Sequence, residues 1–203
     1  MALLFANNNS LSAITTKPSG LSGGSMNLIS TQTASSSSTI SFTSGIDSTY
    51  DEYVFKFYDI HPATDNTQFS FQVDTGTNTN YNQTITSTFF DAYHDESDSD
   101  NAVGYRTALD QAQGTAFQNL TGFSGNGNDE CSSGTLHIFE PSSSVFVKHF
   151  IYDGNTHKSN NQSMRALVAG YFNTTSAINA INFQFSSGNI DAGKIKLYGI
   201  KDI

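Results

Sequence analysis

The sequence predicts an all-β protein: an antiparallel β-sandwich, jelly-roll-like, with an extended N-terminal arm. Short runs in which apolar and polar residues alternate recur along the chain, as in strands with one buried face. Only 13% of the residues are charged, whereas Ser, Thr and Asn supply 69 of the 203 and Gly another 16. This composition suits turns and solvent-facing strand positions. No segment has a convincing helical pattern. Many short strands with almost no helix are typical of a β-sandwich, and a barrel is the alternative.

The chain divides into an arm, residues 1–25, and a sandwich domain, residues 26–203. The arm combines an apolar patch, Leu3, Leu4 and Phe5, with an Asn-rich run, a proline and the segment GLSGGS. Such a mixture fits neither a helix nor a sheet strand. Two interpretations stay open: a disordered tail, or an arm whose apolar patch docks on a neighbouring subunit.

Ten segments of the domain are predicted to be strands. Residues 53–60 and 68–73, joined by a turn containing Pro62, are expected to be antiparallel neighbours. The predicted strands are residues 27–31, 39–42, 53–60, 68–73, 84–93, 135–139, 145–152, 164–172, 180–186 and 194–199.

The last of these strands, within Ser163–Ile200, are expected to form an antiparallel meander without catalytic groups. Its alternation predicts which side chains face the core: Ile181, Phe183, Phe185, Ile195 and Leu197 inward, and Asn182, Gln184, Lys194 and Lys196 outward. The best helical candidate in the chain is residues 106–113, at most two turns, which Gly114 would end.

Charge and cysteine content exclude several classes of protein. A net charge of −9 with nine scattered Lys and Arg residues argues against nucleic-acid binding. The single cysteine, Cys131, excludes a scaffold held by intrachain disulfides. No run approaches the roughly 18 apolar residues of a membrane span, and the N-terminus lacks the basic region of a signal peptide. We therefore expect a soluble protein made in the cytoplasm, without membrane insertion.

The densest acidic segment is residues 91–100, DAYHDESDSD. Asp95, Asp98 and Asp100 could supply carboxylate oxygens to a hard cation such as calcium, although the spacing of an EF-hand is absent. The competing and favoured interpretation is a solvated acidic loop.

Catalytic motifs are lacking. There is no GxSxG, and Cys131 lies in a Gly/Ser/Asn-rich loop without a basic neighbour. The strand carboxylates that a glycosidase would need (Asp59, Asp74, Asp91 and Glu140) form no recognisable motif. No catalytic residue and no organic cofactor are expected. Tyr93, Tyr105 and Tyr152 could form a carbohydrate platform, although most aromatic residues follow the core pattern.

Four segments carry a family resemblance: residues 45–53, GIDSTYDEY; 60–63, IHPA; 170–178, GYFNTTSAI; and 185–199, FSSGNIDAGKIKLYG. Together they resemble a group of small, largely uncharacterised proteins of marine tailed bacteriophages, cyanophage-like and pelagiphage-like, over roughly residues 28–200. The resemblance implies a virion or tail-associated β-sandwich and carries over no catalytic residue.

These observations predict a non-enzymatic virion protein, in the tail or its appendages first and on the capsid surface as a decoration protein second. It would act by protein–protein association, as a homo-oligomer whose arm contacts other virion proteins, with polar loops facing a host-surface glycan. The rival hypotheses are a calcium-stabilised carbohydrate-binding module and a carbohydrate-active enzyme.

Overall fold

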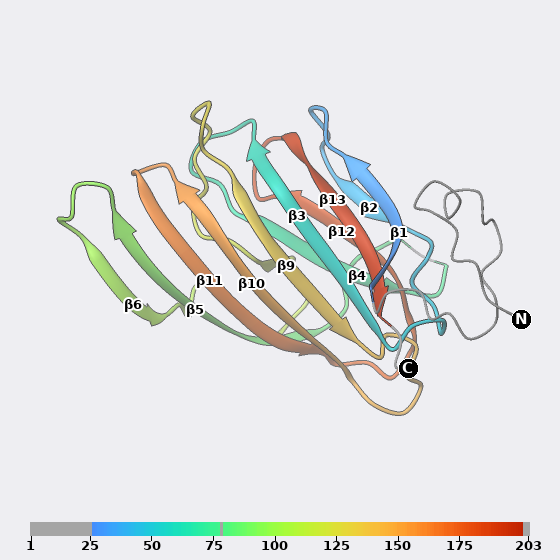
Figure 1. Ribbon diagram of the computed structural model, residues 1–203. Coiled ribbons are helices and arrows are strands. Elements are labelled where there is room, and N and C mark those ends of the chain that lie inside the picture. Colours follow the sequence, from blue (N-terminus) through green and yellow to red (C-terminus); the bar gives the residue numbers. More distant parts are fainter. Residues whose placement is uncertain (1–25, 78, 201–203) are drawn as a thin grey trace, which may run out of the picture.

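The computed structural model describes residues 26–77 and 79–200, which form thirteen β-strands (Figure 1). The strands are β1 Met26–Thr33, β2 Ile40–Phe42, β3 Glu52–Pro62, β4 Phe69–Thr75, β5 Ile85–Asp95, β6 Asn101–Tyr105, β7 Ala112–Gly114, β8 Gln118–Asn119, β9 Ser132–Phe139, β10 Lys148–Lys158, β11 Gln162–Phe172, β12 Ile178–Phe185 and β13 Ile190–Ile200. The predicted arm, with Leu3, Leu4 and Phe5, lies outside the described residues.

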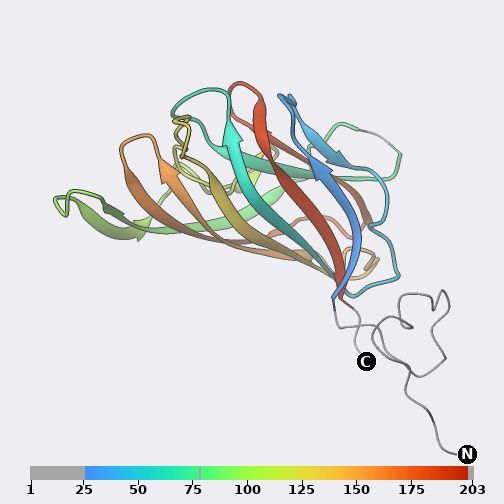
Figure 2. The ribbon, with the colours of Figure 1, turned by 45° about the horizontal axis from the view of Figure 1, so that its top comes forward.

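Two antiparallel sheets of unequal size make a sandwich. The large sheet has nine strands in the order β1-β13-β3-β9-β10-β11-β5-β6, with β7 also paired to β5. The small sheet has four, in the order β2-β12-β4-β8. In Figure 1 the small sheet lies behind β1, β13, β3 and β9, while β5 and β6 project at the other end. The same green strands extend away from the two-layered part in Figure 2. The predicted antiparallel β-sandwich is therefore confirmed, and one end of the large sheet extends beyond the small one.

The chain changes sheet repeatedly, which corrects two predicted pairings. The strands β3 and β4 are not neighbours, because β3 pairs with β13 and β9 whereas β4 pairs with β12 and β8. The last three strands are not a meander either: β11 and β13 belong to the large sheet and β12 to the small one. Alternation shows which side chains of a strand are buried. It does not show which sheet the strand belongs to, because the inner faces of both sheets are apolar.

Aromatic side chains fill the space between the sheets. Phe183 of β12 makes ring contacts with five other phenylalanines, at centroid distances of 5.2–6.3 Å, from Phe57 at the shortest to Phe42 and Phe71 at the longest. Most of these contacts are edge-to-face or tilted, a favourable geometry for phenyl rings. All five residues predicted to face inward from the last two strands are buried.

The best helical candidate forms no helix, and two further predictions are wrong. Residues 106–113 contain no helix: a turn at 107–109 leads into the short strand β7. Asn182 is buried instead of exposed, because β12 is a central strand flanked by Ser41 and Gln72. The strand predicted from Val145 begins only at Lys148. Within the described part of the chain no helix is long and apolar enough to span a membrane.

Candidate functional site

A hollow of about 600 Å³ opens on the inner face of the large sheet, at the end that the small sheet does not cover. The strands β5 and β11 form its floor together with Lys158 at the end of β10, Tyr105 and the loop that follows it form one wall, and residues around Phe123 form another. A concave site of this size, with a few polar groups and aromatic rings, is typical of small-molecule binding. We call it the β5–β11 pocket.

The strands supply polar side chains here because their inward-facing positions change character along their length. On β5 the buried Ile85 and Phe89 are followed on the same face by Asp91 and Tyr93. On β11 the buried Met164 is followed by Gln162 towards the uncovered end. Side chains two residues apart share a face of a strand, so both sets point to the same side of the sheet.

Asp91 and Arg106 form the best-anchored polar pair of the pocket. The Arg106 Nε lies 2.8 and 2.9 Å from the two Asp91 carboxylate oxygens, and its Nη2 lies 2.8 Å from Oδ1. The Asp91 side chain is 6% exposed and that of Arg106 37%. The Arg106 amide also donates to the Phe89 carbonyl, at 2.9 Å. Arg106 therefore neutralises a nearly buried carboxylate and ties the loop to β5.

A second set of polar groups runs through Lys158, Gln162 and Asp100. The Lys158 Nζ donates to Gln162 Oε1 at 2.6 Å, and the Gln162 Nε2 donates to Asp100 Oδ2 at 3.0 Å. The pKa of Lys158 is lowered, mainly because burial disfavours the charged ammonium group. The Arg106 charge lowers it further, and the charges of Asp91 and Asp100 oppose the shift. A cationic donor, an amide and an anionic acceptor therefore follow one another along one side of the pocket. We call it the polar row.

Aromatic rings lie beside the polar row. The Lys158 Nζ is 5.0 Å and the Arg106 Cζ 5.7 Å from the centroid of the Tyr93 ring. Phe123 is 44% exposed although it lines the pocket. The neighbouring Gly122 lies against β11, because a Cβ there would come within 2.8 Å of the Met164 sulfur. Phe123 therefore offers part of its apolar surface to a ligand.

Of the three tyrosines predicted as a carbohydrate platform, two line the pocket. Tyr93 lies on its floor, and Tyr105 lies at its rim, with its ring 5.0 Å from that of Phe90 and its hydroxyl donating to Asp110. Tyr152 is 1% exposed and belongs to the core. Its pKa is raised, mainly because burial disfavours the charged form.

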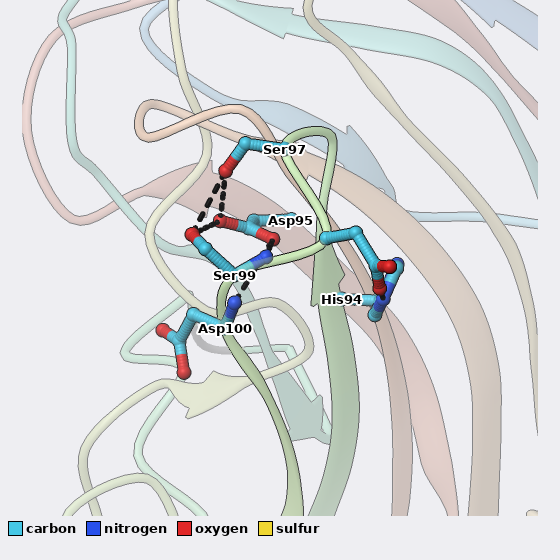
Figure 3. Close-up of polar contacts among 6 residues, drawn as sticks. His94, Asp95, Ser97, Ser99 and Asp100 are labelled. Atoms are coloured by element: carbon cyan, nitrogen blue, oxygen red, sulfur yellow. Dashed lines mark hydrogen bonds and ion pairs between the residues drawn. The ribbon is translucent and has the colours of Figure 1, made fainter.

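The three predicted calcium ligands do not converge. Figure 3 shows Asp95 turned to Ser97 and Ser99 while the Asp100 carboxylate points away from it. Asp95 accepts hydrogen bonds from the hydroxyls of Ser97 and Ser99 and from the amides of Ser99 and Asp100, at 2.6–3.0 Å. These bonds, led by the Ser99 hydroxyl, hold the pKa of Asp95 well below its usual range. Asp98 pairs with His94 at 2.9 Å, and Asp100 turns to Gln162.

No group of three or more His, Cys, Asp or Glu residues that could hold a metal ion occurs within residues 26–77 and 79–200. The acidic segment is a hairpin turn closed by its own serines, which use the oxygens of Asp95 that a cation would need. This geometry does not support the calcium hypothesis.

Sequence reasoning missed Arg106, Lys158, Gln162 and Phe123. They come from three separate segments, and no local motif links them to Tyr93 or to Asp91. The available signal was weak: a polar residue stands at an inward position near the same end of β5, β10 and β11. Compared with protein-family models, with curated proteins and with solved structures, the chain has no match.

Proposed function

We propose that this protein is a non-enzymatic component of a bacteriophage particle, in the tail or its appendages first and on the capsid surface second, and that the β5–β11 pocket binds a saccharide of the host surface. The virion role is supported by the resemblance of residues 28–200 to phage proteins. The ligand class is supported by the observation on which this proposal chiefly depends: the polar row beside the exposed ring of Phe123.

A sugar matches this arrangement in two ways. Its hydroxyls both donate and accept hydrogen bonds, so neighbouring hydroxyls can donate to Asp100 and accept from Lys158. Gln162, which is 3% exposed, holds these two groups in place through its amide oxygen and nitrogen. Its C–H faces are apolar and pack against aromatic rings, which Phe123 and Tyr93 provide. Two positive and two negative side chains line the pocket (Lys158, Arg106, Asp91, Asp100), which favours a neutral saccharide.

Binding is favoured over hydrolysis because the pocket carboxylates are already engaged. A glycosidase needs one carboxylic acid that donates a proton and one carboxylate that acts as base or nucleophile. Both oxygens of Asp91 accept hydrogen bonds from Arg106, and Asp100 accepts one from Gln162. An enzymatic role would require the Asp91–Arg106 pair to open.

Titration with saccharides tests the ligand class. Glucose, galactose, mannose, N-acetylglucosamine and their short oligomers are added to the full chain while the ring NMR signals of Phe and Tyr are followed. We expect saturable shifts with at least one sugar, and at least tenfold weaker binding in Gln162→Ala and Phe123→Ala. Phe146→Ala is the matched control, because Phe146 is 73% exposed and does not line the pocket.

Three outcomes would contradict the proposal. If no sugar shifts the signals, or if both pocket variants bind as the parent does, the saccharide site is wrong. Release of reducing ends from the bound oligomer that Asp100→Asn abolishes would make the protein an enzyme. Absence of the chain from purified phage particles, measured by mass spectrometry, would remove the virion role.

A further inference from the structure

A cluster of lysines lies on the outer face of the large sheet, on the strands β3 and β13. Lys56 and Lys196 are directly opposite each other in the β3–β13 register, and Lys194 is opposite Tyr58. Tyr198 completes the group, because it lies two residues beyond Lys196 on the same face of β13. We call these five residues the lysine patch.

The patch concentrates positive charge in an acidic protein. The other described cations each have polar partners: Arg106 pairs with Asp91, Arg165 with Asp153, Lys148 donates to two carbonyls and Lys158 to Gln162.

The patch lysines lack such partners. Within residues 26–77 and 79–200 no carboxylate pairs with Lys56, Lys194 or Lys196. Lys56 and Lys196 have only ring contacts, 5.7 Å to Tyr198 and 5.3 Å to Tyr58. Like charges directly opposite each other on neighbouring strands are destabilising, so this face gains stability when an anion binds.

The surface around the patch is hollowed on both sides of Tyr58. One hollow, of about 480 Å³, is lined by Tyr58, Asp59, Lys194 and Lys196, and another, of about 520 Å³, by Tyr58, Lys56 and the Arg165–Asp153 ion pair. Gly193 lines the first hollow with a positive φ of 120°, and a Cβ there would come within 2.7 Å of the Asp59 carbonyl oxygen, so only glycine lets β13 lie this close to β3. Tyr58 is 39% exposed between the two hollows. The surface therefore suits an elongated ligand that passes over a ring.

We propose that the lysine patch binds an acidic polysaccharide, one that carries carboxylate or sulfate groups. The lysine ammonium groups act as point charges for these anions, and Tyr58 packs against a sugar face. A saccharide is favoured over duplex DNA because three lysines on a chain of net charge −9 cannot track a long phosphate backbone. The choice of a saccharide rests on the proposed function, but the site is separate from the β5–β11 pocket.

Chromatography of the full chain on immobilised dextran sulfate at low salt tests the patch, with neutral dextran as the reference. We expect the parent to be retained on dextran sulfate alone and to elute as salt rises. Lys196→Gln should weaken binding at least fivefold, and the Lys56→Gln/Lys196→Gln pair should abolish retention. Val103→Glu is the control, because it also lowers the net charge by one on the outer face of the same sheet, at an 80% exposed side chain that lines neither hollow. Tyr58→Ala, which keeps the charge, should weaken binding about threefold.

Several results would overturn the proposal: no retention of the parent, equal weakening by Val103→Glu and Lys196→Gln, or tighter binding to a duplex DNA fragment than to dextran sulfate. Salt-sensitive self-association that Lys196→Gln abolishes would assign the patch to a second copy of the chain and would also overturn it. Gln162→Ala separates the two proposals: it should lose neutral-sugar binding and keep its retention on dextran sulfate.

Discussion

The inner face of the large sheet has a covered end and an uncovered end, and the two differ in chemistry although the same strands build both. Under the small sheet, β5 presents Phe89 and β10 presents Phe150, both fully buried. Beyond the small sheet, the same faces of these strands present Asp91, Tyr93 and Lys158 around a pocket. Because buried apolar area stabilises a fold only where something excludes water, the change from phenylalanine to polar residues follows the edge of the small sheet.

Along a single strand, the residues that stabilise the fold and those that line the pocket are therefore different ones. The covered end should respond to mutation in stability, and the uncovered end mainly in ligand binding. Four predictions test this division.

The largest effect is expected for Phe183→Ala at the covered end. Phe183 is fully buried among five rings, so its removal should cost about 3–5 kcal/mol through lost burial and a residual cavity. Phe123→Ala at the uncovered end should change stability by about 0.5 kcal/mol or less. Urea unfolding measures the free energy of unfolding of both variants. Equal decreases in the two variants would contradict the difference between the two ends.

Arg106→Leu should have an intermediate effect, because it leaves the nearly buried Asp91 carboxylate without its partner. Removing one member of a fully buried pair costs about 3–5 kcal/mol, and the partly exposed guanidinium reduces this to about 2 kcal/mol. The double variant Asp91→Asn/Arg106→Leu should recover part of the loss. A double variant no more stable than Arg106→Leu alone would contradict this account of the pair.

Lys148 provides a pH test at the covered end. It is fully buried, its Nζ donates to the carbonyls of Thr174 and Ser176, and burial lowers its pKa. The unfolded chain then binds more protons between the lowered pKa and the ordinary lysine value of about 10.4, so stability should rise with pH in that window.

Lys148→Met should lose this rise, together with about 1 kcal/mol at neutral pH from the unmade hydrogen bonds. Urea unfolding from pH 7 to 10.5 makes the measurement, with Lys194→Met as an exposed control. Parallel curves for the parent and Lys148→Met would show that the buried lysine does not titrate as expected.

The smallest effect is expected for Asp95→Asn, in the exposed hairpin beyond the sandwich. The amides of Ser99 and Asp100 lose a charged acceptor, so their hydrogen exchange should accelerate while the urea midpoint stays unchanged. Because the folded-state pKa of Asp95 is lowered, its contribution is complete above about pH 4 and is lost as pH falls through the lowered value. Protection of these amides in the parent that already disappears near pH 5 would contradict this.

Sequence reasoning predicted which residues are buried far better than which strands are neighbours. The alternation in β12 and β13 correctly placed Phe183 and Leu197 in the core. It could not show that β12 pairs with β2 and β4, since those partners are remote in sequence. The short strands β6, β7 and β8 were missed because they are too brief, or too exposed, to carry an apolar pattern.

Half of the pocket was within reach of sequence reasoning and half was not. Asp91 was singled out as a strand carboxylate, Tyr93 as part of a carbohydrate platform and Asp100 as an oxygen ligand of the acidic segment. Lys158 and Phe123 were not, because only pairing of β10, β11 and β5 and the position of the 120–125 loop bring them together. The calcium hypothesis arose because the density of acidic residues is visible in the sequence. The hydrogen bonds by which neighbouring serines occupy the Asp95 carboxylate are not visible there.

By itself, the sequence determined an all-β chain whose strands each have one apolar face, because strand periodicity and turn chemistry act over a few residues. Only the tertiary structure decided where the small sheet ends, and therefore which inward positions form a core and which form a pocket. The physical reason is that water is excluded from a residue by segments distant in the chain. Phe89 and Asp91 occupy successive inward positions of β5. Phe89 packs into the apolar core, whereas Asp91 pairs with Arg106 beside the pocket.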